Sequence, residues 1–84
     1  MIDLRKNKTN EQPLPKWFKG VLYTHGESVT NPFSGETYHL TPAELSMYDF
    51  IMGCQLTGMA QNDMIKALSW FRKANPEAYM VLLD

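Results

Sequence analysis

Two histidines and one serine are the first candidates for chemistry in this 84-residue chain. His25 lies at an expected turn, and His39 lies opposite Ser28 if residues 32–35 form a hairpin loop. A serine beside an imidazole makes two thirds of a hydrolase triad, but a triad also needs a group that orients the imidazole and an oxyanion loop. The sequence offers neither, so it favours an ordinary cross-strand polar pair.

Metal and acid–base chemistry have equally little support in the sequence. A zinc site needs three or four converging ligands, whereas the chain has two histidines, one cysteine and no HxxxH pair. Glu44, Asp49 and Asp63 are too scattered to be assigned as an acid–base pair. We therefore predict no catalytic, cofactor-binding or metal-binding residues and no enzyme activity. A site completed across an oligomer interface is the alternative.

The single cysteine and the N-terminal sequence indicate a compartment. Cys54 cannot close an internal disulfide, and its apolar surroundings favour a buried hydrophobe over a reactive thiol. No window approaches 18 consecutive apolar residues, and the N-terminal "MIDLRKNKTNEQPLPK" lacks the apolar segment of a signal peptide. These features predict a cytoplasmic protein without a membrane partner.

Charge is divided unevenly along the chain. Residues 1–20 hold five basic and two acidic side chains, whereas residues 21–84 hold three basic and seven acidic ones, giving net charges of +3 and −4. This division predicts that a basic arm is attracted to the acidic body of its own chain or of a second copy. The more specific alternative is that the basic arm binds nucleic acid.

The polar and aromatic residues near the middle of the chain predict a β-hairpin. "ESVTN" and "ETYHL" flank the turn residues "PFSG", in which Pro32 and Gly35 suit the loop. One face of this hairpin would carry Val29, Tyr38 and Leu40, and the other would carry polar side chains. Residues 21–24, rich in β-branched and aromatic side chains, are a candidate third strand.

A helix is expected to begin directly after the hairpin. Thr41, Pro42 and Glu44 form the pattern of a capping box with proline at the first helical position. The spacing predicts an inner face made by Leu45, Tyr48, Met52 and Leu56 with Ile51 beside them. Gly53 inside this helix suggests the close approach of a neighbouring helix, and Gly58 is the expected stop.

Two further helices are expected. The first covers residues 62–74, with Met64, Ala67, Leu68 and Phe71 on its inner face and Ile65 adjoining; the second is short, follows the "NPE" start signal and ends near Leu82. The predicted fold class is α+β, with an N-terminal extended arm, a small antiparallel hairpin, two main α-helices and a short C-terminal helix. We expect the arm to cover residues 1–19 and one domain to cover residues 20–84.

Several of these motifs resemble a group of phage proteins. Four motifs occur in the same order as in small uncharacterised proteins of marine tailed phages and marine metagenomes. They are the turn at Asn31, Pro32, Ser34 and Gly35, the helix start at Leu40, Thr41 and Glu44, the pair Tyr48–Asp49, and the segment 75–79. The likeness covers residues 26–84. It implies a phage-encoded protein of the host cytoplasm, and it supplies no catalytic residues.

Apolar side chains suggest how the protein acts. Six methionines and ten aromatic residues are many for a domain of this size, so we expect a partner or a second copy to cover part of them. The predicted function is that of a small, non-enzymatic, self-associating interaction protein, most simply a two-fold dimer. A nucleic-acid-associated accessory protein is the alternative. The predicted interface is formed by the arm and the outer faces of the two main helices, and it comprises Trp17, Phe18, Met47, Phe50 and Trp70.

Overall fold

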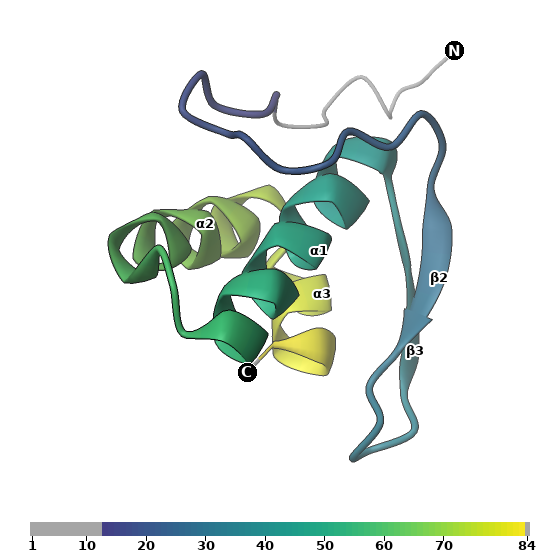
Figure 1. Ribbon diagram of the computed structural model, residues 1–84. Helices are drawn as coiled ribbons and strands as arrows, with labels where there is room; N and C mark the ends of the chain where they lie inside the picture. The colour runs from purple at the N-terminus through teal and green to yellow at the C-terminus, as the bar shows by residue number, and fades with distance from the viewer. Residues whose placement is uncertain (1–12, 84) are drawn as a thin grey trace, which may run out of the picture.

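The computed structural model describes residues 13–83, which form a two-stranded sheet and three helices. In chain order these are β2 (Glu27–Thr30), β3 (Thr37–Leu40), α1 (Pro42–Thr57), α2 (Gln61–Ala74) and α3 (Pro76–Leu82). Helices α1 and α3 lie between the hairpin on one side and α2 on the other (Figure 1). This arrangement is the α+β fold predicted from the sequence.

The hairpin has the predicted register. Ser28 pairs with His39, Val29 with Tyr38 and Thr30 with Thr37 in an antiparallel ladder. Gly35 has φ of 79°, a left-handed conformation that glycine adopts without strain. Because side chains alternate along a strand, Leu40 is fully buried against the helices and the polar residues face water.

The start of α1 is fixed by the predicted capping box. The Thr41 hydroxyl accepts a hydrogen bond from the Glu44 backbone N–H at 3.3 Å, and Glu44 Oε1 accepts one from the Thr41 N–H at 3.0 Å. The other oxygen, Glu44 Oε2, accepts from Asn75 Nδ2 at 3.2 Å. One buried carboxylate therefore caps α1 and ties it to the junction of α2 and α3. The helix ends at Gly58, which has φ of 71°.

The predicted inner face of α1 is partly wrong. Met47, expected on the outer side, is fully buried, whereas Leu56, expected inside, is 87% exposed. The reason is that two layers cover α1. The hairpin and α3 cover one side of its N-terminal part, and α2 with residues 13–23 covers the other (Figure 1). A single apolar stripe cannot describe a helix that is buried from two directions.

Residues 21–24 do not form the candidate third strand. The backbone N–H of Tyr23 donates to Ser46 Oγ at 3.0 Å, and Ser46 Oγ itself donates to the carbonyl oxygen of Pro42 at 2.8 Å. The segment therefore crosses the first turns of α1 instead of adding to the sheet, as its path over the top of that helix shows (Figure 1).

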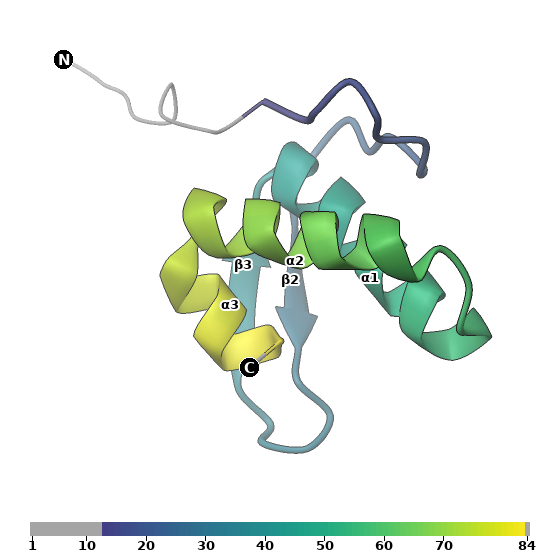
Figure 2. The ribbon, with the colours of Figure 1, turned by 90° about the vertical axis from the view of Figure 1, so that its left-hand side faces the viewer.

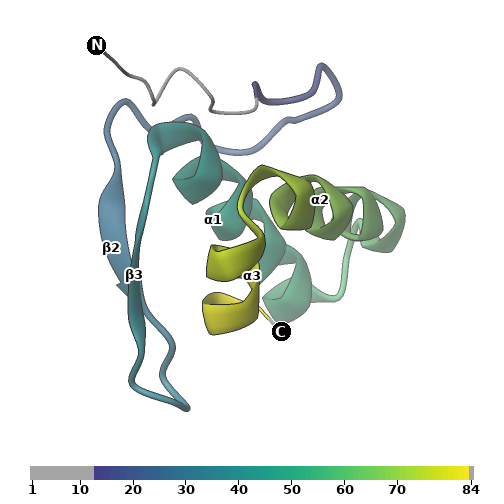
Figure 3. The ribbon, with the colours of Figure 1, turned by 180° about the vertical axis from the view of Figure 1, so that it is seen from behind.

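The last two helices follow the sequence pattern closely. Helix α2 crosses α1 and α3, with the hairpin behind them (Figure 2). Helix α3 lies between α2 and the hairpin when the molecule is seen from behind (Figure 3). Asn75 Oδ1 accepts from the Ala78 N–H at 3.1 Å and caps α3. Ala67 and Phe71 of α2 are buried as predicted, whereas Ile65 is 64% exposed.

Candidate interaction surface

The polar residues that suggested chemistry lie on the outer face of the hairpin. Ser28 Oγ and His39 Nδ1 are 3.5 Å apart, and His25 Nδ1 is 3.2 Å from the hydroxyl of its neighbour Thr24. All four side chains are exposed. The geometry is that of a cross-strand contact in water. Within residues 13–83, no three His, Cys, Asp or Glu side chains gather where they could hold a metal ion.

Asp49 acts on a tyrosine of the crossing segment. Its negative charge, together with partial burial and a side-chain hydrogen bond, raises the pKa of Tyr23 above the ordinary value of 10.0. The cause is that the anionic phenolate would face the Asp49 carboxylate. This interaction, with the bond from the Tyr23 N–H to Ser46 Oγ, holds Tyr23 against α1.

Four of the five residues of the predicted interface lie where residues 13–18 meet α1 and α2. The Phe50 ring lies 6.2 Å from Trp17 and 5.6 Å from Phe18, measured between centroids, within the range of favourable aromatic pairs. Trp70 Nε1 donates to the carbonyl oxygen of Pro13 at 3.0 Å. Residues 13–18 are thus held on α1 and α2 of their own chain; the rest of the expected arm lies outside the described residues.

Two of these five residues are not on the surface. Met47 is fully buried and Trp70 is only 8% exposed, so the prediction that both lie on outer helix faces is wrong. Their burial follows from the position of residues 13–18, which cover the junction of α1 and α2. The helical spacing could not reveal this cover because it comes from a segment without secondary structure.

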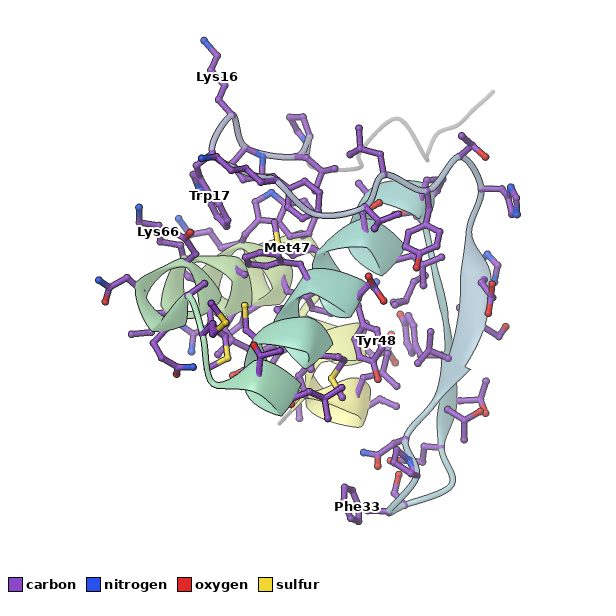
Figure 4. The ribbon with its side chains drawn as sticks, in the orientation of Figure 1. Lys16, Trp17, Phe33, Met47, Tyr48 and Lys66 are labelled. Carbon is purple, nitrogen blue, oxygen red and sulfur yellow. The ribbon has the colours of Figure 1, made fainter. Side chains whose placement is uncertain are left out.

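Two basic side chains lie beside Trp17. Among residues 13–83, all five lysines and arginines lie either at positions 16–19 or on α2. Lys66 Nζ lies 5.9 Å from the centre of the Trp17 ring, a cation–π distance, and Lys16 extends into solvent beside them (Figure 4). We call Lys16 and Lys66 the basic edge.

An apolar groove runs along the exposed side of α1. It has a volume of about 350 Å³ and lies between residues 20–21 and the loop that joins α1 to α2. We call it the α1 groove. Its lining includes two polar side chains, Asp49 and Thr57, and is otherwise apolar: Gly20, Val21, Phe50, Gly53, Cys54, Met59 and Ala60. Val21 is 60% and Met59 69% exposed, so the rim of the groove is itself apolar and open to water.

Gly53 forms the floor of this groove. A Cβ atom built on Gly53 would have nothing within 4 Å, so the prediction that a neighbouring helix of the domain approaches it is wrong. Cys54 beside it is 5% exposed, and burial followed by the charge of Asp63 raises the pKa of its thiol above 9.0. The groove therefore offers apolar surface and an uncharged thiol rather than a reactive group.

A second feature that the sequence analysis did not single out is Phe33. This side chain is 98% exposed and stands at the far end of the hairpin, beyond the helices (Figure 4). The Phe33 N–H donates to Asn31 Oδ1 at 2.8 Å, and Asn31 Nδ2 donates to the Val81 carbonyl oxygen at 2.9 Å. The sequence did contain a sign of this exposed side chain: an aromatic residue stands in a turn, at a position where a polar residue would form the turn equally well.

Comparison with protein-family models, with curated proteins and with solved structures finds no match for the chain. Among the helices that the structure describes, none has the length and apolar character needed to cross a bilayer. The function therefore has to be argued from the surface itself.

Proposed function

We propose that this protein is a small interaction protein that self-associates through the α1 groove, in the host cytoplasm if it is phage-encoded. One observation carries the proposal: an apolar groove of about 350 Å³ is open along the C-terminal half of α1, and a Cβ atom added to Gly53 would have nothing within 4 Å among residues 13–83. Glycine inside a helix costs about 1 kcal/mol relative to alanine. Within the monomer, the glycine allows no packing contact that would offset this cost. A partner that approaches the helix backbone at Gly53 would make such a contact.

The exposed apolar side chains near the groove support the same proposal. Leu22 is 69% and Leu56 87% exposed, and each directly neighbours a groove residue in the chain. Fully burying a side chain of this size removes roughly 60–120 Å² of apolar surface from water, at about 25 cal/mol per Å². Exposed apolar surface of this kind marks interaction sites where it is contiguous.

Of the interface predicted from the sequence, only part is available for this role. Phe50 lines the groove, and the rings of Trp17 and Phe18 pack against its ring. Met47 and Trp70 are occupied inside the chain. The two-fold dimer predicted from the sequence and a head-to-tail assembly are alternative geometries for the same groove.

Sedimentation equilibrium tests the proposal with a matched pair of variants. Met59→Ser removes an apolar side chain from the groove rim, and Met80→Ser removes one of nearly equal exposure, 67% against 69%, from α3. We expect the mass of the wild type to rise with concentration, Met59→Ser to reduce this rise, and Met80→Ser to leave it unchanged. A wild type that stays at its monomer mass of 9.7 kDa would exclude self-association.

The basic edge favours a second candidate function, binding to nucleic acid. Lys66 lies against the Trp17 ring with Lys16 beside them, and a cation beside an aromatic ring suits single-stranded nucleic acid. Binding of this kind weakens steeply with salt because phosphate contacts release counterions. Retention on single-stranded DNA that is strong at low salt and is lost in Lys66→Gln would favour this candidate; no retention at low salt would eliminate it.

A further inference from the structure

We infer that two copies of this protein associate by exchanging residues 13–18, so that this segment of each copy packs on α1 and α2 of the other. We call residues 13–18 the strap and residues 19–22 the hinge. The exchange rests on the proposed self-association and identifies the segment that the two copies share. The structure itself shows which segment fits the site, because the strap already occupies it within one chain.

The strap is attached in a way that allows it to leave as a unit. Within residues 13–83, no backbone-to-backbone hydrogen bond joins it to either helix, and the N–H of Phe18 donates inside the strap. Trp70 Nε1 donates to the Pro13 carbonyl oxygen at 3.0 Å. The rings of Trp17 and Phe18 lie 6.2 and 5.6 Å from that of Phe50, measured between centroids. Release of the strap therefore breaks side-chain contacts and leaves the helices and the sheet intact.

The surface beneath the strap must remain covered. Met47 is fully buried and Trp70 is 8% exposed, and the strap packs against the cluster that contains both. Release alone would expose these side chains to water, which is unfavourable. The strap of a second copy has the same sequence and restores the same contacts. The occupant that the site accepts from outside its own chain is therefore the strap of a second copy.

The hinge has the properties of a strand without a partner. Residues 21–24 were a candidate strand from their sequence, but they form none in the structure. Val21 is 60% and Leu22 69% exposed, and no hydrogen bond holds the backbone of residues 19–22 among the residues that the structure describes. Reciprocal exchange brings two hinges past each other in opposite directions about a two-fold axis. Each hinge then supplies the antiparallel neighbour that the other lacks.

Gly20 is the residue at which the closed and exchanged forms differ most. A Cβ atom on Gly20 would lie 2.6 Å from Phe18 Cζ and 3.3 Å from Phe50 Cβ. The edge of the Phe18 ring therefore occupies the place of a side chain at position 20 when the strap folds back on its own chain. In the exchanged form Phe18 lies on the second copy and the hinge is extended, so this restriction is removed.

The balance between the two forms depends on protein concentration. Exchange conserves the strap contacts, and a short tether favours the closed form by an effective concentration in the millimolar range. Pairing of the hinges and burial of Val21 and Leu22 favour the dimer. Two aromatic side chains of the strap and the two that they cover bury at most about 600–1,000 Å² per copy. This range includes the roughly 800 Å² per partner of a standard interface.

Gly20→Val tests the exchange by the direction of its effect. The new side chain displaces Phe18 in the closed form, and a β-branched residue favours the extended hinge. In sedimentation from about 10 μM to about 1 mM, we expect its dimer dissociation constant to fall about tenfold below that of the wild type. Gly20→Ala should have a smaller effect of the same sign. If copies associate at the α1 groove without exchange, a side chain on its Gly20 wall should weaken association or leave it unchanged.

The wild type gives a second measurement that does not depend on a variant. Refolding from urea at about 1 mM should give a dimer of twice 9.7 kDa, and refolding at about 10 μM should give the monomer. The dimer should survive size-exclusion chromatography after dilution, because each strap must be released before the copies separate. Its tryptophan emission should match that of the monomer, since Trp17 and Trp70 regain their contacts.

The outcomes separate the exchange from the proposed function. If the wild type associates but Gly20→Val associates less or equally well, the exchange is overturned and self-association stands. A wild-type dimer that separates at once on dilution, or one with red-shifted tryptophan emission, has the same meaning. A wild type that is monomeric under all these conditions overturns both.

Discussion

Replacing Gly53 by alanine should stabilise the folded monomer. Gly53 lies within α1, its φ is not in the left-handed region, and an added Cβ would meet no atom within 4 Å. The change therefore removes only the entropic cost of glycine in a helix, about 1 kcal/mol. For a domain of this size, 1 kcal/mol corresponds to a rise of roughly 4–8 °C in the melting temperature.

Gly26→Ala is the matched control, because the same substitution should have the opposite effect there. A Cβ on Gly26 would lie 2.2 Å from the carbonyl oxygen of Leu40 and 3.1 Å from His39 Nε2. The Leu40 oxygen belongs to the backbone of β3, so the hairpin itself must shift. Overpacking of this kind costs typically about 1–3 kcal/mol.

Urea unfolding followed by circular dichroism measures both effects at protein concentrations low enough to exclude association, since association would add to the apparent stability of the wild type. The midpoint should rise for Gly53→Ala and fall for Gly26→Ala, with unchanged slopes. If Gly53→Ala is less stable than the wild type, the conclusion that the space above this residue is open is wrong. It would also remove the argument that only a partner makes use of the glycine.

Three further predictions concern the tip, the tyrosines and the thiol. Asn31→Ala should lower the free energy of unfolding by about 1–3 kcal/mol in a urea titration, because the Val81 carbonyl oxygen and the turn both lose a partner; Asn31→Asp should not restore the stability, because its carboxylate keeps the acceptor of the turn but faces the Val81 carbonyl oxygen without a donor. Burial raises the pKa of Tyr48 above 10.0, so the folded state favours the neutral phenol. Its contribution to stability is complete below about pH 10 and is lost as pH rises through the higher folded pKa; unfolding measured from about pH 8 to about pH 11 should show a smaller loss for Tyr48→Phe. Cys54 should react with an aromatic disulfide about tenfold or more slowly in the folded protein than in urea, because it is buried and its pKa is raised; equal rates would mean that the thiol is accessible.

Local signals in the sequence determined the hairpin and the helix boundaries. The register of β2 and β3, the positive φ of Gly35 and the capping box of Thr41 and Glu44 all appear as predicted. Each depends on partners only a few residues away along the chain, so the residue types and their spacing carry enough information. The same holds for Asn75, which caps α3 through a residue three positions later.

Tertiary structure alone decided which surfaces remain open. The burial of Met47 and Trp70, the exposure of Leu56 and the groove above Gly53 depend on where residues 13–23 cross the helices. That path is set by contacts between distant parts of the chain: Trp70 with Pro13 and Ser46 with Tyr23. Periodicity shows that a helix has an apolar side, but it contains no information about how many neighbours will cover that side or from which direction. The candidate site lies where that cover ends, because α1 continues beyond the segment that crosses it.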